Sequence, residues 1–176
     1  MEKEKPMPEF AKLEPSDAEG VARMSALATE IVREHYDPII GKAQNDYMIA
    51  KFQAPEAIRN HLESGADYRF VVEDGREVGY IAFFPRGRAL YLSKFYLRRE
   101  ARGRGLGRAM LEFVVGRAEE AGLEAVELNV NRNNPSLEIY RAMGFEIARA
   151  EKNAIGGGFF MDDYVCRLDL AKRPRA

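Results

Sequence analysis

The glycine-rich stretch REARGRGLGRAML, residues 99–111, has the composition of a ligand-binding loop. Gly103, Gly105 and Gly107 alternate with arginines, and an apolar helix-forming run follows them. The first amides of a helix have no acceptor within the helix, and the helix dipole adds about half a positive charge at that end. Glycines let the backbone approach a ligand closely because they carry no Cβ. The stretch therefore predicts an anion site, most simply for a phosphate group.

Two common nucleotide-binding motifs do not fit this stretch. A P-loop requires Lys and then Ser or Thr after its last glycine, whereas Arg108 and Ala109 follow Gly107. A dinucleotide-binding fingerprint requires the spacing GxGxxG, whereas this sequence has GxGxG after a strand in the middle of the chain. A loop with solvated arginines and no ligand remains an alternative at this point.

A second stretch, NNPSLEIYRAMGF at residues 133–145, combines a helix start with a tyrosine. Asn134 fits the N-cap of a short helix, and Pro135 fits its first position. Tyr140 carries a phenol that can donate a proton, although a half-buried tyrosine with only a packing role is an equally simple interpretation. Capping alone explains Asn134, and a contact to a cofactor is a second interpretation, which applies to Ser136 as well.

Together the two stretches resemble the GCN5-related N-acetyltransferase (GNAT) family. Residues 102–107 match the family pattern Arg/Gln-x-x-Gly-x-Gly/Ala. Residues 133–145 resemble its segment Asn-x-x-(Ser/Ala)-x-x-x-Tyr-x-x-x-Gly-Phe. The resemblance covers about residues 68–170. The segments DYMIAKF, LSKFYL and MDDYV are also similar to the polyamine-acetylating PaiA-like branch of the family.

This resemblance implies acetyl-CoA as the donor and a primary amine, with a small amine or polyamine favoured, as the acceptor. It places the pyrophosphate on the amides of residues 103–108 and the pantetheine arm along the strand end at residues 95–97. Tyr140 would act as the general acid towards the leaving thiol, and no metal is expected. The residues that the resemblance assigns to the cofactor are Phe95, Leu97, Arg102, Gly103, Arg104, Gly105, Leu106, Gly107, Arg108, Asn134, Ser136 and Tyr140.

The acceptor side carries weaker signals. His35, Tyr36 and Tyr47 lie in the region where the family often builds the acceptor wall. Asp162 is the fourth candidate, because a carboxylate on the last strand could attract a cationic amine. Adjacent strand residues face opposite sides, so only one of Asp162 and Asp163 can point into a pocket. Acetylation of a protein N-terminus or lysine, and a non-catalytic acyl-CoA sensor, are the alternative functions.

The predicted architecture is a single α/β domain over residues 1–176, with a mixed, mostly antiparallel sheet and a splayed parallel strand pair at its centre. Apolar periodicity predicts helices at about 16–34, 55–64 and 105–121, and a short one from residue 134. Strands are expected at about 68–73, 77–84, 89–97, 125–131, 145–149 and 159–170. The helices within residues 16–64 are expected on the acceptor side, and a helix break is expected at residues 35–38 because Pro38 disfavours helical geometry before it.

The composition limits the class of protein. Hydrophobic residues make up 46% of the 176 residues and charged residues 31%, which is typical of a globular domain. The net charge of −1 and the pI of about 6.2 disfavour a nucleic-acid partner, despite the five arginines between residues 98 and 108. Cys166 is the only cysteine and no run of about 20 apolar residues occurs, so we expect a cytoplasmic protein without a membrane partner. A homodimer remains open.

Overall fold

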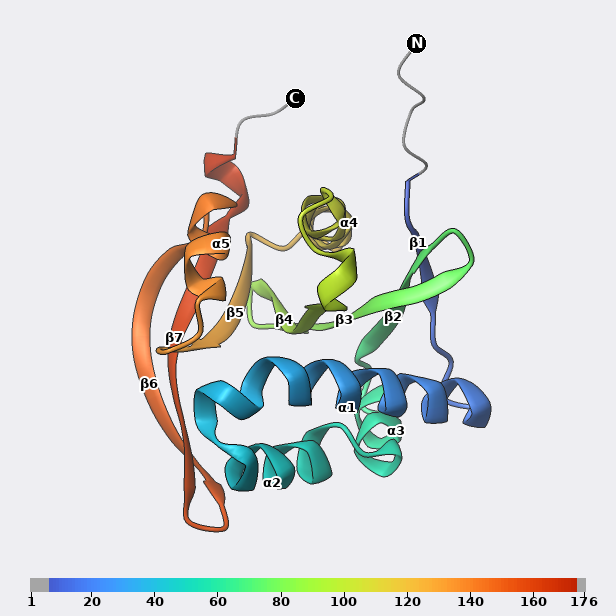
Figure 1. Cartoon of the computed structure of the whole chain (residues 1–176). Helices are drawn as coiled ribbons and strands as arrows, with labels where there is room; N and C mark the ends of the chain where they lie inside the picture. The colour runs from blue at the N-terminus through green and yellow to red at the C-terminus, as the bar shows by residue number, and fades with distance from the viewer. Residues whose placement is uncertain (1–6, 174–176) are drawn as a thin grey trace.

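The computed structural model describes residues 7–173; residues 1–6 and 174–176 of the predicted domain lie outside this part. Its centre is a sheet in the strand order β1-β2-β3-β4-β5-β7-β6 (Figure 1). The strands are β1 (Glu9–Lys12), β2 (Asp67–Glu73), β3 (Arg76–Arg86), β4 (Ala89–Leu97), β5 (Ala125–Asn131), β6 (Glu146–Gly156) and β7 (Phe159–Asp169). The helices are α1 (Ala18–Ile40), α2 (Lys42–Phe52), α3 (Pro55–Glu63), α4 (Leu106–Glu120) and α5 (Ser136–Ala142).

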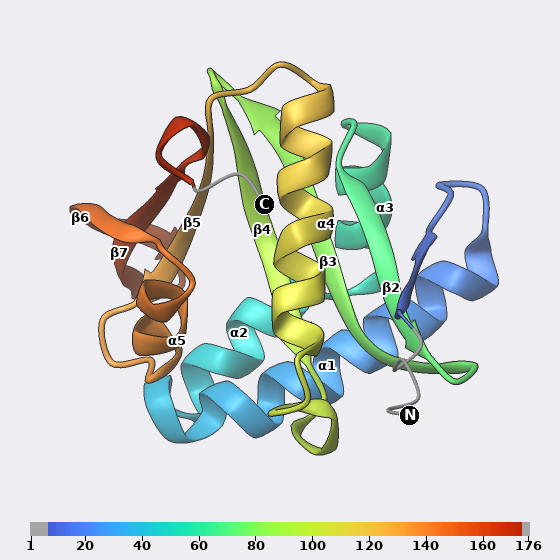
Figure 2. The ribbon, with the colours of Figure 1, turned by 90° about the horizontal axis from the view of Figure 1, so that it is seen from above.

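The helices form two layers, one on each face of the sheet. Helix α4 packs on one face, and α1, α2 and α3 lie on the other (Figures 1 and 2). No helix in the described part of the chain is both long and apolar enough to cross a membrane. This arrangement confirms the predicted α/β fold and separates an α4 side from an α1–α2 side.

The central strands β4 and β5 are the parallel pair of the sheet, and the other neighbouring strands are antiparallel. Their pairing is short, because it joins only Ala89–Tyr91 to Ala125–Glu127. Beyond these residues the two strands separate, and a gap opens between their C-terminal halves (Figure 2). The predicted splayed pair is confirmed, because β4 and β5 pair only at their first residues.

Side-chain alternation on β5 gives the two faces different chemistry. Val126, Leu128 and Val130 point into the apolar core beneath α4. The residues between them, such as Asn129 and Asn131, line the α1–α2 side. The α4 side is therefore a packed core, whereas polar groups gather on the opposite face.

A β-bulge changes this alternation on β4. Leu92 pairs with Phe83 and Lys94 pairs with Ala82, so Ser93 is the extra residue in the register, with its hydroxyl bonded to the Ala82 carbonyl at 3.1 Å. The extra residue places both Ser93 and Lys94 on the α1–α2 side instead of on opposite faces. The bulge lies where β4 leaves β5, so it directs two consecutive side chains to the edge of the gap.

The predicted break at residues 35–38 is wrong. Helix α1 continues through Pro38 to Ile40, although an interior proline costs about 3 kcal/mol. Contacts to other elements hold this last turn in place: Tyr36 accepts a hydrogen bond from Asn134, and Asp37 accepts one from Asn45 on α2. The longer helix carries His35 and Tyr36, two of the four predicted acceptor residues, on its last turns.

Several other elements differ from the sequence predictions. Helix α2 was not predicted, since its apolar residues do not form one stripe and its N-cap residue Gly41 provides no side-chain cap. The short strand β1 was also not predicted, and β6 extends to Gly156 instead of ending at Arg149. β3 ends at Arg86 instead of Phe84. The longer β6 and β7 form a hairpin that reaches α2, where Tyr47 donates a hydrogen bond to Ile155 at 2.9 Å.

Candidate active site

The loop before α4 has the backbone geometry of an anion site. Gly103 and Gly105 adopt φ angles of 75° and 85°, a region that favours glycine. The first backbone bond of the helix runs from the Ala109 amide to the Gly105 carbonyl, at 3.2 Å. The amides of residues 105–108 have no hydrogen-bond acceptor among residues 7–173. These four donors at a helix start are free to bind a phosphate.

The three arginines of the loop have different surroundings. Arg102 donates two hydrogen bonds to the Leu97 carbonyl, at 3.1 and 3.2 Å, and so fixes the loop against the end of β4. Arg104 forms an ion pair with Glu73 at 2.8 Å. Arg108 lines a second cavity of about 570 Å³ beside the α5–β6 turn. The side chain of Arg108 therefore faces a cavity, whereas Arg102 and Arg104 contact other parts of the chain.

Replacing Gly105 by alanine should lower the free energy of unfolding by about 1–2 kcal/mol, because an L-residue in this left-handed conformation is strained. It should also weaken CoA binding, since the strain shifts the amides of the cradle. Gly116→Ala in the same helix is the control: its φ is ordinary and no heavy atom lies within 4 Å of the new Cβ. It should gain about 0.5–1 kcal/mol. Urea denaturation and calorimetric titration with CoA measure both variants; equal effects would remove the special role of Gly105.

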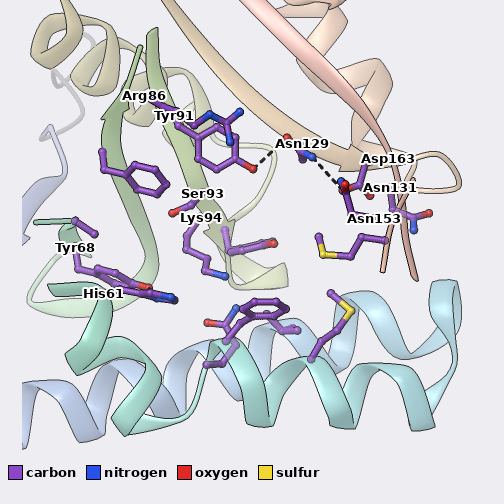
Figure 3. A pocket seen from close by; sticks show the side chains of 18 of the residues that line it. His61, Tyr68, Arg86, Tyr91, Ser93, Lys94, Asn129, Asn131, Asn153 and Asp163 are labelled. Atoms are coloured by element: carbon purple, nitrogen blue, oxygen red, sulfur yellow. Dashed lines mark hydrogen bonds between the residues drawn. The ribbon is translucent and has the colours of Figure 1, made fainter. Parts of the chain in front are cut away.

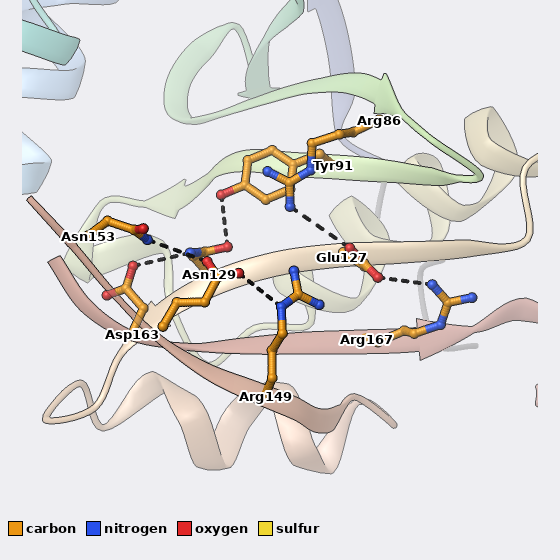
Figure 4. Close-up of polar contacts among 9 residues, drawn as sticks. Arg86, Tyr91, Glu127, Asn129, Arg149, Asn153, Asp163 and Arg167 are labelled. Carbon is orange, nitrogen blue, oxygen red and sulfur yellow. Dashed lines mark hydrogen bonds and ion pairs between the residues drawn. The ribbon is translucent and has the colours of Figure 1, made fainter. Parts of the chain in front are cut away.

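Polar side chains connect β4, β5 and β7 at the gap (Figure 4). Tyr91 donates to Asn129 Oδ1 at 3.1 Å, and Asn129 Nδ2 donates to Asp163 Oδ2 at 3.3 Å. At the paired end of the strands, Glu127 lies 2.9 Å from Arg167 and 3.9 Å from Arg86. The cluster of Glu127, Arg167 and Arg86 stabilises the end where β4 and β5 are paired. Beyond this end, Asn129 is the first residue of β5 that faces the cavity.

Tyr140 lies on α5 against the open end of β4. Its ring centroid is 6.0 Å from that of Phe95 and 5.9 Å from that of Phe145. Its hydroxyl forms no hydrogen bond with any residue that the structure describes. Burial raises the pKa of Tyr140, so the phenol stays protonated across the neutral range. A protonated donor without a partner therefore lies next to the strand that the resemblance assigns to the pantetheine arm.

Asn134 joins α1 to the start of α5. Its Oδ1 accepts from the Ser136 amide at 2.9 Å and lies 3.1 Å from His35 Nε2, and its Nδ2 donates to the Tyr36 hydroxyl at 3.1 Å. Helix α5 begins one residue later than predicted, with Pro135 at its N-cap, although Asn134 Oδ1 still binds the amide of the first helical residue, Ser136. One Nδ2 hydrogen of Asn134 remains for any cofactor contact. Burial lowers the pKa of His35, which favours its neutral form. The Tyr36 hydroxyl lies 3.5 Å from that of Tyr96 on β4.

A cavity of about 1020 Å³ lies between the sheet and the α1–α2 layer (Figure 3). Apolar side chains at helical spacing form its roof: Val32, Tyr36 and Ile40 from α1, and Met48 and Phe52 from α2. Polar residues of its sheet wall include Arg86, Tyr91, Ser93, Lys94, Tyr96, Asn129, Asn131, Glu151, Asn153 and Asp163. The cavity therefore lies on the opposite face of the gap from the amides at the start of α4.

The predicted acceptor residues are distributed unevenly around this cavity. Tyr36 lines it, and His35 supports Tyr36 through Asn134. Tyr47 lies outside it and packs against Phe159 and the Ile155 carbonyl. Asp162 also lies outside, where Arg132 binds it at 2.7 Å, while the adjacent Asp163 is only 3% exposed and faces the cavity. The alternation argument was therefore right, but Asp163 takes the place of Asp162.

Sequence reasoning missed most of the polar cavity residues, among them Tyr91, Lys94 and Asn129. A signal existed for Asn129, because Val126, Leu128 and Val130 were assigned to one face and the residues between them had to face the other. No comparable signal existed for Lys94, whose direction depends on the bulge at Ser93. The predicted cofactor residues Phe95 and Leu97 do lie on the part of β4 that borders the gap. Cys166 is buried in the core beneath α4 and has no role at the site.

Comparisons with known proteins agree with this geometry. A family model described as an acetyltransferase (GNAT) domain matches residues 36–161. PaiA N-acetyltransferase from Thermoplasma acidophilum, solved in complex with coenzyme A, superposes with a TM-score of 0.75 at 18% identity, covering 92% of this chain and 98% of that one. A GCN5-related N-acetyltransferase from Rhodopseudomonas palustris superposes with a TM-score of 0.77 at 15% identity, covering 97% and 100%.

The fold and the site define an acyltransferase. The chain belongs to the GNAT acetyltransferase family, whose donor is acetyl-CoA. The predicted family, enzyme class and cofactor are thereby confirmed. A curated sequence relative, UPF0157 protein YqkA of Bacillus subtilis, is 30% identical over 95 residues, which are 53% of this chain. The chain spans about a quarter (26%) of that protein's length.

Proposed function

We propose that this protein acetylates the primary amine of a small molecule that binds in the 1020 Å³ cavity. The observation that carries the proposal is the position of this cavity, on the α1–α2 side of the gap between β4 and β5. A donor on the α4 side and an acceptor in the cavity would then meet at the gap. The roof formed by α1 and α2 favours a small acceptor over an extended peptide.

The residues around the gap fit acetyl-CoA. The free amides of residues 105–108 would bind its pyrophosphate. The edge of β4 from Leu92 to Tyr96 has no β5 partner in the described chain, so the backbone groups on that edge are available to the pantetheine arm, whereas the Leu97 carbonyl already accepts from Arg102. When bound, acetyl-CoA supplies an activated acetyl thioester. Tyr140 would face its sulfur from α5, beside Phe95.

Two side chains would handle the protons of this reaction. A lysine-like amine has a pKa of about 10.4, so its deprotonation at pH 7 costs about 4–5 kcal/mol. Asp163 would accept that proton from the cavity side, because it is the buried carboxylate there and no cation pairs with it among the described residues. Tyr140 Oη would donate a proton to the sulfur. Direct transfer from donor to acceptor is the simplest route, because the one cysteine, Cys166, is buried in the core and so is a poor nucleophile.

A thiol-release assay with matched acceptors tests the proposal. Small primary amines should support turnover above the acceptor-free rate, whereas peptides with a free N-terminus or lysine should not. Turnover with peptides alone would assign the protein to the N-terminal or lysine acetyltransferases instead. CoA binding without turnover on any acceptor would favour an acyl-CoA sensor. Mass spectrometry of the product distinguishes an N-acetylated amine from simple hydrolysis.

A further inference from the structure

Four charged side chains line the large cavity, and two of them have no partner of opposite charge. Arg86 lies 3.9 Å from Glu127, and Glu151 is paired with Arg149 at 2.9 Å. Lys94 and Asp163 form no ion pair with any residue in the range 7–173. The cavity therefore presents one unpaired cation and one unpaired carboxyl group.

Lys94 is held in the cavity by the bulge in β4 and by aromatic packing. Its ammonium lies 5.7 Å from the centre of the Phe52 ring, and no hydrogen bond is made to it within the described chain. Burial lowers the pKa of His61 and the charge of Lys94 lowers it further, which favours the neutral form of the imidazole. A half-buried cation without a counter-ion is costly, and a ligand with a negative charge would remove that cost.

The two unpaired groups lie apart in the cavity, with Lys94 nearer its middle and Asp163 at one side (Figure 3). Lys94 points towards His61 and Tyr68, whereas Asp163 lies beside Asn131 and Asn153. Both are on the face opposite α4, so the phosphates of a donor bound at the start of α4 cannot be the counter-ion of Lys94. The missing negative charge therefore belongs to the acceptor.

We propose that the acceptor is a small zwitterion whose carboxylate or phosphate group binds Lys94 while its amine binds beside Asp163. This inference rests on the proposed function and narrows it, because polyamines carry only positive charge and would place an ammonium near Lys94. The pKa of Lys94 is lowered to about 8 by burial, so the side chain is still mostly charged at pH 7. Lys94 is thus a specificity-determining residue, separate from the groups that move protons.

Matched amines with and without the anionic group test this proposal. The pairs are 4-aminobutyrate with propylamine, lysine with 1,5-diaminopentane, and 2-aminoethyl phosphate with ethanolamine. In the wild-type enzyme, kcat/KM for the anionic member of at least one pair should exceed that of its neutral or cationic partner by tenfold or more. The first two pairs report on a carboxylate and the third on a phosphate. Equal or lower values for every anionic member would overturn the proposal.

Variants of Lys94 locate the effect. Lys94→Met should abolish the preference for the anionic acceptor, so that the two kcat/KM values of a pair become about equal, mainly because KM for the anionic acceptor rises. Lys94→Arg should keep part of the preference. Lys152→Met is the control, because Lys152 also lies over an aromatic ring, that of Phe160 at 5.0 Å, but is exposed and outside the cavity. A preference that persists in Lys94→Met would contradict the assignment, and circular dichroism checks that the variants are folded.

Binding measurements separate this proposal from the proposed function. If no amine supports thiol release, the small-amine function fails, and calorimetric titration of the CoA-bound protein with 4-aminobutyrate and propylamine then decides the role of Lys94. Tighter binding of 4-aminobutyrate that is lost in Lys94→Met would retain the anion site. Absence of binding, or binding that is equal for both compounds, would overturn it.

Discussion

Tyr140→Phe should lower kcat by about 10²-fold or more, the usual contribution of a positioned general acid, and leave the KM for acetyl-CoA nearly unchanged. The substitution removes one hydroxyl that has no partner in the described structure, so packing against Phe95 and Phe145 is kept. Because burial raises its pKa, Tyr140 remains a donor throughout the neutral range. The loss in kcat should therefore be of similar size from pH 6 to pH 9 in a thiol-release assay.

Tyr164→Phe is the matched control for this experiment. Tyr164 is also a partly buried tyrosine packed against the core beneath α4, but it lies on β7 and outside the large cavity. Its loss should leave kcat within about twofold, as expected for removal of a hydroxyl with no chemical role. An unchanged kcat in Tyr140→Phe, or equal losses in both variants, would remove Tyr140 from the acid role.

The loop and the helix starts that we propose for the cofactor were predictable as structural elements because their signals are local. Gly103 and Gly105 indicate positive φ angles within one loop. The apolar run that follows them predicts the helix α4, whose first amides are exposed next to this loop. Asn134 and Pro135 likewise mark the start of α5 within a few residues. Each of these features depends on the conformation of its own segment, so the sequence pattern alone was sufficient to locate it.

The acceptor side was less predictable because it depends on contacts between distant segments. The bond of Asn129 to Tyr91 and to Asp163 joins three strands, and no local pattern gives their register. Lys94 faces the cavity only because Ser93 is bulged. Pro38 stays helical because bonds from Asn134 and Asn45 hold the last turn of α1. In all three cases tertiary packing overrides the local preference.

Asp163→Asn should reduce kcat/KM for an amine acceptor by about 10²-fold, because the side chain can no longer accept a proton in the cavity. Burial raises the pKa of Asp163, with smaller contributions from Asp162 and Glu151, while the bond from Asn129 opposes the shift. In the wild type, kcat/KM should therefore rise with pH as Asp163 loses its proton, at a pH above the usual titration range of a carboxyl group. This rise should be absent from the residual activity of the variant, as measured by pH profiles of kcat/KM.

The same substitution should raise the Tm at pH 7. A carboxyl whose folded pKa lies above its unfolded value of about 3.9 binds more protons in the folded state, so stability falls as the pH rises through that interval. Asparagine has no such penalty and still accepts the bond from Asn129, so the gain should be present at pH 7 and absent below about pH 3.9. A lower activity combined with a higher Tm is typical of a functional residue, because a purely structural one would lose both.

Asp162→Asn gives the control for both measurements, because this neighbouring carboxylate is half-exposed, pairs with Arg132 and lies outside the cavity. Its removal should leave kcat/KM within about twofold and change the stability by less than about 1 kcal/mol, as for an exposed ion pair. If Asp162→Asn were the variant that loses activity, the acceptor amine would have to approach from the Arg132 side of β7. The 1020 Å³ cavity would then not be the acceptor site, and the roles of Asp163 and Lys94 would fail together.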